Sequence, residues 1–392
     1  MEAGNQTLLK KNNQKAIINY IISGGAISRA DLAKRLRISK PTVSANVFDL
    51  IEKKIITEIG YSETEIGKKP MLLDFNKEYK YVLALDFISY YTRNIVSFAI
   101  CNLYCEPIFI EKIALNNNYS RKEVENDVPN TITDFLKRKK LPLSKIGRVV
   151  ITAPSIVRDN FYAKFVCKNG DEVNLIDIFE KSFPNKIEVK NDINLAALGE
   201  KYFGVGKDYK TIGFFWLGYA MGSGLIIDGS LYEGPSSAAG EIGHTIIRSP
   251  FDGSITNIDT LLSKNNLKKI FINDKLNAQS SIIGDKLING TFHFQDFTDA
   301  FAKNDSYIRN FISIIINEVA IVIANISATL DLEMIILGGD YNSFGNTFVT
   351  AVETAISKIY FSKTKVATAM FDNSAMLGSF KLGSEYIIEN II

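Results

Sequence analysis

The stretch "TIGFFWLGYAMGSGLIIDGSLYEG" (residues 211–234) alternates apolar, β-rich runs with glycine turns. This pattern is typical of a strand, a tight glycine turn and a hairpin of two further strands. The same order occurs earlier, in "YVLALDF" (81–87), "NIVSFAICN" (94–102) and "PIFIEKIAL" (107–115). Two similar meanders predict a duplicated, two-lobed α/β fold with a cleft between the lobes.

Further strands and helices complete each half. "GRVVITAPS" (147–155) has the composition of a buried strand and follows a polar segment at 120–140 that we expect to be helical. "KIEVKNDINLAALGEKYFG" (186–204) predicts a strand, a short turn and a helix. A long predicted helix over 306–331 precedes "LEMIILGGDYN" (332–342), a strand that ends in a Gly-Gly turn.

The composition indicates a soluble globular protein with more than one core. The chain has 392 residues, of which 46% are apolar and 22% are charged. We predict no signal peptide and no membrane span, because polar residues interrupt the longest apolar runs. Cys101, Cys105 and Cys167 are too few for a disulfide framework. We interpret them as small buried hydrophobes and expect a cytoplasmic protein.

The first eighty residues predict a winged helix-turn-helix. The segments 12–25, 26–39 and 40–56 each place apolar residues at helical spacing, and Ser28 is a good N-cap for the second. A tight turn separates the second helix from the third, as in a helix-turn-helix. "IITEIGYSETEIGKKPMLLDF" (55–75) then predicts two strands joined by a hairpin, which form a wing.

This module has a positive charge and a polar face. Its first 80 residues hold 14 Lys and Arg against 9 Asp and Glu. The residues that we expect to face outward near the start of the third helix are Ser39, Lys40, Thr42, Ser44 and Asn46. Such side chains suit phosphates and base edges, and Lys68 and Lys69 give the wing a basic loop for a narrow minor groove. We therefore predict DNA binding; the alternative is a helical protein-interaction module.

Four motifs resemble those of a known family. They are "NDINLAALGE" (191–200), "GYAMGSGLIIDGSLYEG" (218–234), "AGEIGH" (239–244) and "ILGGD" (336–340). Their order and spacing resemble the ROK family (repressor, open reading frame, kinase) over nearly the whole chain. The resemblance implies an actin-like ATPase (ribonuclease H-like) fold, and the N-terminal module is similar to that of the family's repressors for xylose and N-acetylglucosamine. We expect a DNA-binding domain at 1–78 and a sugar-sensing and oligomerisation domain at 79–392.

The nucleotide side of the family's kinases is not preserved. Kinase members hold ATP phosphates on glycine-rich turns, but the first turn here reads "LDFISYYTRN" (85–94), with bulky residues after Asp86. The second turn, at 218–224, keeps three glycines but also holds Tyr219. We interpret these glycines, and the pair at 338–339 beside the family's adenine pocket, as structural. We predict no catalytic residue and no cofactor.

The sugar side is better preserved. The residues that match the family's sugar site are Asn191, Asp192, Glu241, His244 and Asp259. Asp192 corresponds to the catalytic base of the kinases, and Asp259 aligns with a sugar-binding glutamate that is one methylene longer. Carboxylates and amides suit sugars because they pair with hydroxyls in a fixed geometry. The alternative role for Asp192 is to cap the helix that follows it.

We predict no metal site. In the family the histidine of "GEIGH" also binds zinc, together with cysteines of a downstream loop. Here that loop reads "SPFDGSITNID" (249–259) and contains no cysteine. A structural zinc normally needs four nitrogen or sulfur ligands, so we interpret His244 as a sugar contact or a loop hydrogen-bonding group.

The sequence thus predicts a sugar-responsive, DNA-binding transcriptional regulator that is not an enzyme. It binds a double-stranded DNA operator, and its body binds a sugar or sugar derivative without phosphorylating it. The resemblance implies a homodimer or a dimer of dimers on a palindromic site. Two alternatives stay open: a sugar kinase with a fused DNA-binding domain, and a constitutive DNA-binding protein whose body only dimerises.

Overall fold

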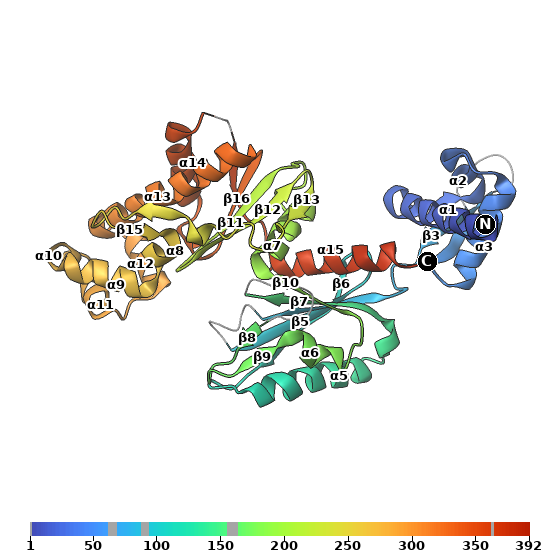
Figure 1. Cartoon of the computed structure of the whole chain (residues 1–392), viewed down its shortest axis with the longest axis horizontal. Coiled ribbons are helices and arrows are strands. Elements are labelled where there is room, and N and C mark those ends of the chain that lie inside the picture. The colour runs from blue at the N-terminus through green and yellow to red at the C-terminus, as the bar shows by residue number, and fades with distance from the viewer. Residues whose placement is uncertain (1, 62–68, 88–93, 155–163, 362–363) are drawn as a thin grey trace.

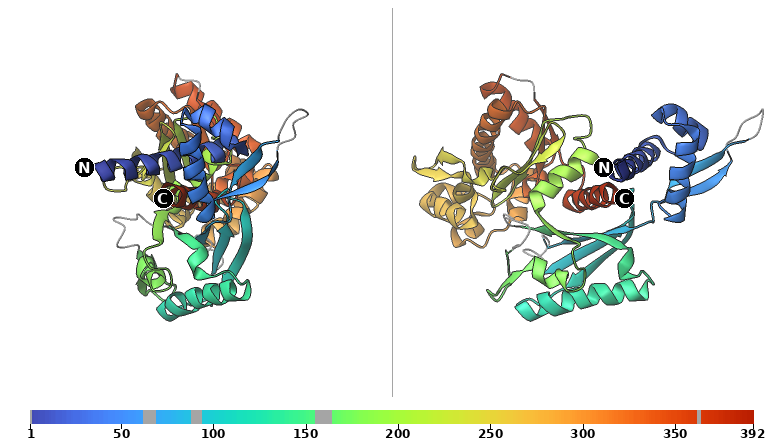
Figure 2. Two further views of the ribbon diagram at one scale, coloured as in Figure 1. Left: turned by 90° about the vertical axis from the view of Figure 1, so that its right-hand side faces the viewer. Right: turned by 45° about the vertical axis from the view of Figure 1, so that its right-hand side comes forward.

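The computed structural model of the chain describes residues 2–61, 69–87, 94–154, 164–361 and 364–392. A small N-terminal module and two α/β lobes make up the molecule (Figure 1). Helix α15 (Ser374–Glu389) runs from the junction of the lobes toward the N-terminal module, and the C-terminus lies beside that module in both views of Figure 2.

The N-terminal module folds as the predicted winged helix-turn-helix. Its elements are α1 (Glu2–Gly24), β1 (Ile27–Ser28), α2 (Arg29–Leu36), α3 (Lys40–Glu52), β2 (Ile56–Tyr61) and β3 (Met71–Phe75). The strands pair antiparallel in the order β1-β3-β2. Ser28 caps α2 as predicted, by accepting the backbone N–H of Asp31 at 3.1 Å, and Ser39 caps α3.

The first lobe holds a five-stranded mixed sheet. Its strands are β4 (Tyr81–Asp86), β5 (Ile95–Cys101), β6 (Pro107–Ala114), β7 (Ile146–Ala153) and β10 (Ile187–Asn191), in the order β10-β7-β4-β5-β6. One face is covered by the π-helical turn η1 (Glu123–Asp127), α5 (Val128–Arg138) and α6 (Leu175–Glu180), which confirms the predicted helix at 120–140. The short turn η2 (Leu143–Lys145) and the hairpin β8 (Lys164–Val166) and β9 (Glu172–Asn174) complete the lobe.

The second lobe repeats this sheet. Its strands are β11 (Ile212–Leu217), β12 (Met221–Ile227), β13 (Ser230–Tyr232), β16 (Met334–Gly338) and β17 (Lys365–Thr368), in the order β13-β12-β11-β16-β17. In both lobes three antiparallel strands form a meander, and two further strands run parallel to its first strand. The duplicated two-lobed fold predicted from the repeated meander is therefore confirmed.

Helices form the outer part of the second lobe. They are α8 (Ile258–Leu262), α9 (Lys264–Asn273), α10 (Lys275–Ala278), α11 (Gly284–Asn289), α12 (Phe294–Ala302), α13 (Ser306–Leu330) and α14 (Asn346–Ile359). Two short turns, η3 (Ile242–His244) and η4 (Asp340–Phe344), and the hairpin β14 (Ile246–Arg248) and β15 (Ile255–Asn257) join them.

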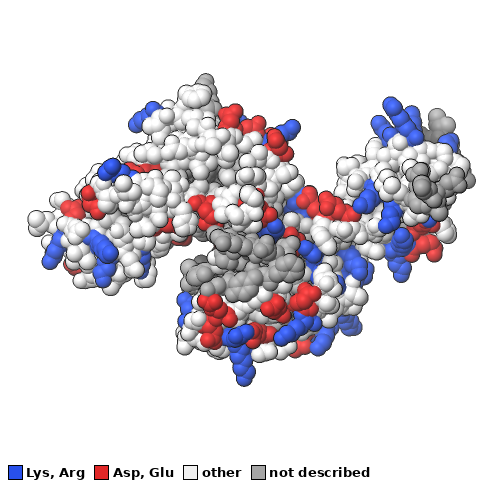
Figure 3. All heavy atoms as spheres, in the orientation of Figure 1, with Lys and Arg blue, Asp and Glu red and all other residues white. Residues whose placement is uncertain are grey.

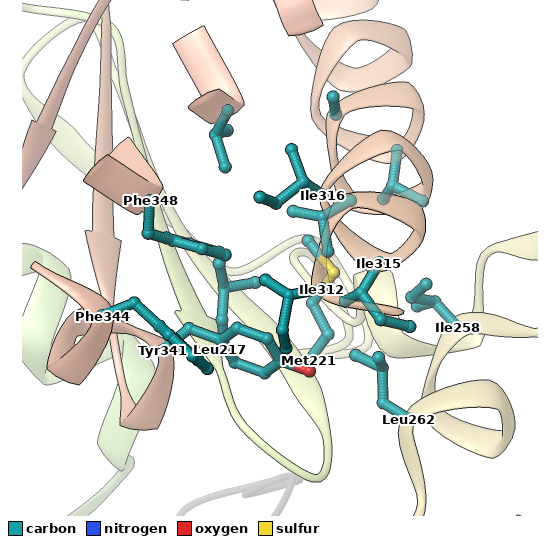
Figure 4. Packing of buried hydrophobic residues seen from close by; sticks show 14 of the residues in the cluster. Leu217, Met221, Ile258, Leu262, Ile312, Ile315, Ile316, Tyr341, Phe344 and Phe348 are labelled. Atoms are coloured by element: carbon teal, nitrogen blue, oxygen red, sulfur yellow. The ribbon is translucent and has the colours of Figure 1, made fainter. Parts of the chain in front are cut away.

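Helix α13 is the central core element of this lobe. In the described part of the chain it is the one helix long and apolar enough to span a membrane, yet 56% of its apolar window is buried. Ile312, Ile315 and Ile316 pack in one cluster with Leu217 and Met221 of the sheet (Figure 4). Its apolar composition is therefore accounted for by packing inside the protein.

Helices α7 (Asp192–Tyr202) and α15 cross between the lobes with their backbones in contact. A Cβ atom on Gly199 of α7 would overlap the carbonyl group of Ser374, and one on Gly378 of α15 would overlap that of Leu195. Only glycine permits so close an approach of two helices at these points. The two helices are therefore held in one relative position.

A buried carboxylate joins the same two helices. Glu200, near the end of α7, is fully buried, and its Oε1 accepts the N–H groups of Met370 and Phe371 at 2.9 and 3.1 Å. The same oxygen accepts the Ser374 hydroxyl at 2.6 Å, and Oε2 accepts the N–H of Val205 at 3.2 Å. Charge-assisted bonds of this kind are stronger than neutral ones, so the start of α15 is fixed to the end of α7.

The N-terminal module and the body share one apolar cluster. The cluster extends from Ile17 and Val47 of the module to Ile387 of α15. The rings of Phe75, at the end of β3, and Tyr104, in the first lobe, lie with centroids 5.9 Å apart. The module is therefore packed against the body and is not suspended on a flexible tether.

Candidate functional site

The carboxyl ends of parallel strands carry the candidate site residues of the first lobe. Asp86 ends β4 and pairs with Thr152 of β7, while Asn191 ends β10 and pairs with Ala153 of β7. Strands β4 and β10 thus flank β7 and end at the same edge of the sheet. Ligands bind at such edges in open α/β sheets.

Asn191 caps helix α7, a role that the sequence suggested for Asp192. Its Oδ1 accepts the N–H groups of Ile193 and Asn194 at 2.9 and 3.1 Å, which makes Asn191 the N-cap of α7. Asp192 is the first residue of the helix, and its Oδ1 accepts the Ile193 N–H at 2.9 Å. Its carboxyl group therefore has acceptor capacity beyond this local bond.

The environment of Asp192 disfavours its charge. Burial raises the pKa of Asp192 to about 7, and the nearby carboxylates of Asp86 and Glu241 add to the effect. Near neutral pH this carboxyl group exists in both protonation states. A ligand hydroxyl can therefore find either a donor or an acceptor there.

Glu241 reaches the same place from the second lobe. Gly240, before it, has φ 86°, and its backbone packs against β12, where the Ser223 N–H donates to the Gly240 carbonyl at 2.9 Å. Strand β12 in turn packs on α7, where Ile193 lies close over Gly222. Burial raises the pKa of Glu241, Asp259 raises it further, and His244 opposes both.

The side chains of His244 and Asp259 differ in their exposure and in their hydrogen bonds. His244 ends η3 and is exposed. Asp259, in α8, accepts the N–H of Met221 at 2.6 Å through Oδ1 and lies directly against Gly243. Asp259 therefore fixes η3 to the start of β12. The hydrogen bond joins residues 38 positions apart, so no local sequence pattern could indicate it.

The segment that replaces the family's cysteine loop folds as an ordinary hairpin. Asp252, at its tip, accepts the N–H and hydroxyl of Ser254 at 3.1 and 2.7 Å. These bonds and the β14–β15 pairing hold the turn. Among the described residues no group of three or more His, Cys, Asp or Glu side chains has the arrangement of a metal site.

The second glycine turn is filled by aromatic packing. The Tyr219 ring meets Phe294 edge-on at 6.0 Å, and burial raises the pKa of its hydroxyl to about 12. Gly218 lies against Asp340, and Gly339, with φ 91°, passes close to the backbone of Leu217. These glycines allow close packing, as the structural interpretation expected. Most of the first turn, residues 88–93, lies outside the described residues.

The residues predicted to face DNA differ in their surroundings. Lys40 and Ser44 are exposed on α3, and Lys69 is exposed beside the wing, whereas Lys68 lies outside the described residues. Ser39 and Thr42 pair their hydroxyls at 2.7 Å at the start of α3. Figure 3 shows Lys and Arg side chains spread over the visible face of the module.

The prediction that Asn46 faces outward is wrong. Its side chain is 4% exposed, and its Nδ2 donates to the Thr42 carbonyl at 2.8 Å. Phe48 was not predicted to face outward, yet it is 63% exposed on the same helix. The helical spacing held the signal: Asn46 is three residues after Val43 and four before Leu50, both of which are buried.

These observations define a class of protein: a winged helix-turn-helix joined to a duplicated two-lobed α/β body. Residues 110–385 match the model of the ROK family, and residues 11–57 match a winged helix-turn-helix DNA-binding model. The chain belongs to the ROK family.

Three similar proteins illustrate the range of the family. The chain is 27% identical to the xylose repressor of Caldicellulosiruptor bescii over 369 residues, which cover 91% of this chain and 90% of the repressor. The structure of a ROK family transcriptional regulator, a homologue of the E. coli MLC protein, superposes with a TM-score of 0.77 and 20% identity over 98% of both chains. A ROK family glucokinase from Streptomyces griseus, solved with glucose and AMPPNP, has a TM-score of 0.58 and 18% identity and covers 77% of this chain and 98% of its own.

Proposed function

We propose that the protein is a sugar-responsive, DNA-binding transcriptional repressor. One observation carries this proposal: a single chain joins a winged helix-turn-helix to a cleft where Asp192 and Glu241 stand close together, while Tyr219 occupies the phosphate turn. The similarity to a xylose repressor over most of both chains supports it. The body binds the sugar as an effector and does not phosphorylate it.

The sugar contacts are the carboxyl groups of Asp192 and Glu241 and the exposed ring of His244. These side chains come from both lobes, so a ligand that bridges them changes how the lobes meet. Asn191 and Asp259 support the site by capping α7 and fixing η3. Lys190 of β10 and Glu233, which follows β13, add an ion pair of 2.6 Å between the lobes.

The proposed route from the sugar to the DNA follows two helices. A ligand at Asp192 acts on the first turn of α7, and the other end of α7 is fixed to α15 through Glu200. The far end of α15 lies in the apolar cluster shared with the N-terminal module. A movement of α7 is therefore transmitted to the module through contacts between backbones and buried side chains, which deform little.

We propose the division 1–78 and 79–392 for the DNA-binding and sugar-binding domains, and a homodimer or a dimer of dimers that acts in the cytoplasm. One winged helix-turn-helix presents one recognition helix, and two copies read the two halves of a palindromic site. Sedimentation of the purified protein with and without DNA measures the number of copies.

A ligand screen tests the function. Thermal unfolding is followed with monosaccharides, disaccharides and their phosphates, and each stabilising compound is added to a complex of the protein with a DNA duplex selected from a random pool. An effector raises the melting temperature and lowers the DNA affinity, and both effects weaken in Asp192→Asn. Sugar-dependent release of ADP from ATP that disappears in Asp192→Asn would instead identify a kinase.

A further inference from the structure

The uncovered face of α3 has an unusual chemistry for a recognition helix. The buried side of the helix comprises Val43, Asn46, Val47 and Leu50. The opposite side comprises Pro41, Ser44, Ala45, Phe48 and Glu52, all exposed and spaced as one helical face. Between Pro41 and Glu52, therefore, this face of the helix presents the hydroxyl group of Ser44 and the apolar side chains of Ala45 and Phe48.

The one amide of this helix that could read a base is turned away. Asn and Gln recognise adenine with paired hydrogen bonds, and Arg and Lys recognise guanine. Asn46 is buried, and its Nδ2 donates to the Thr42 carbonyl of the same helix. Lys40, at the first position of α3, is exposed at the start of the helix and not on its middle turns. The middle of the face thus has no side chain suited to paired hydrogen bonds with a purine.

Apolar side chains have one partner in the major groove, the C5-methyl group of thymine. We propose that Ala45 and Phe48 read the methyl groups of thymines on neighbouring base pairs. The inference rests on the proposed DNA-binding function and adds the base that this helix selects. Ala45 and Phe48 are separated by about 4.5 Å along the helix, close to the base-pair step of about 3.4 Å.

The exposure of Phe48 fits this contact. Single exposed apolar residues are common, but this ring, 63% exposed, stands beside Ala45 on the face that the fold leaves for DNA. Phe48 does not belong to the apolar cluster of the module. Its removal therefore affects recognition and leaves the fold intact.

Uracil in place of thymine tests the contact, because uracil lacks only the methyl group. Duplexes are first selected from a random pool with the wild-type protein, and each thymine of the selected half-site is then replaced singly. We expect two neighbouring positions at which the substitution weakens binding about fourfold, the effect of one buried methyl group. If the wild type selects a sequence but no uracil substitution weakens binding more than twofold, the methyl contact is refuted. Failure to select any sequence would instead refute the DNA-binding function.

Variants assign the contact to the side chain. Phe48→Ala should bind the thymine and uracil duplexes equally at one of the two positions. Leu276→Ala is the control, because Leu276 is 87% exposed on α10 of the second lobe, and it should keep the wild-type difference. A Phe48→Ala protein that keeps the full uracil effect, or that changes only self-association, would overturn the proposal.

A second substitution keeps the test decisive if Phe48→Ala does not fold. Phe48→Asn supplies an amide at the same position, and an amide prefers adenine. Selection with this variant should change the favoured base at one position from thymine to adenine. An unchanged thymine would show that Phe48 does not read this base.

Discussion

Replacing Asp192 with asparagine removes a charge that the folded protein does not favour. Burial raises the pKa of Asp192 to about 7, helped by Asp86 and Glu241, whereas an aspartate in the unfolded chain titrates near 3.9. Between these values the folded protein holds a proton that the unfolded chain has lost. The free energy of unfolding therefore falls as the pH rises from about 4 to about 7, and the loss is complete above that window.

The size of the effect follows from the two pKa values. Their difference corresponds to an upper limit of about 4 kcal/mol at pH 8. We expect about half of this, roughly 2 kcal/mol, because the three interacting carboxyl groups share their protons. Asparagine keeps the acceptor oxygen for the Ile193 N–H, so little is lost in exchange. The melting temperature of Asp192→Asn should exceed that of the wild type by roughly 3 °C at pH 8 and by little at pH 4.

Thermal unfolding across this pH range is the assay, without added sugar. Asp252→Asn is the control, since hydrogen bonds from Ser249 and Ser254 lower the pKa of Asp252 and its substitution should not stabilise the protein at pH 8. Parallel curves for Asp192→Asn and the wild type, or a variant less stable at pH 8, would refute the reasoning. At pH 8, where Asp192 is ionised, the same variant should bind the effector about ten- to a hundredfold more weakly, because a charged hydrogen-bond partner is lost.

Three further experiments test other parts of the molecule. Gly378→Ala forces α15 away from the Leu195 carbonyl, so it should abolish the effect of the sugar on DNA affinity while sugar binding persists; an unchanged response would exclude the proposed route. Elemental analysis of the tag-free protein should find no stoichiometric zinc, and zinc that is lost in His244→Ala would contradict this. Lys68→Ala together with Lys69→Ala should weaken binding to all DNA sequences and reduce the slope of the salt dependence by about one for each phosphate that is no longer neutralised; unchanged affinity would remove the wing from the interface.

The sequence predicted those features that depend on local or repeated patterns. The repeated meander predicted both sheets, and the helical spacing and Ser28 predicted the winged helix-turn-helix. Asn46 was misplaced because a polar side chain was taken as exposed, although its spacing from Val43 and Leu50 puts it on the buried side.

The roles of the cleft residues were harder to predict because they depend on distant partners. Asn191, and not Asp192, caps α7, a choice between adjacent residues that backbone geometry decides. Asp259 receives the N–H of Met221, and Glu200 receives two N–H groups from residues about 170 positions away. Contacts of this kind arise only when the whole chain folds.

The apolar cluster shared by the N-terminal module and the body also limits how this protein can be recombined. A graft at the linker after Phe75 would separate that ring from Tyr104 and leave the module's side of the cluster open to water. A transferred DNA-binding module would therefore have to include the matching surface of the first lobe and the end of α15. The alternative is to replace only the outward residues of α3. The operator specificity of such a protein therefore changes more readily by substitutions on one helical face than by the exchange of whole domains.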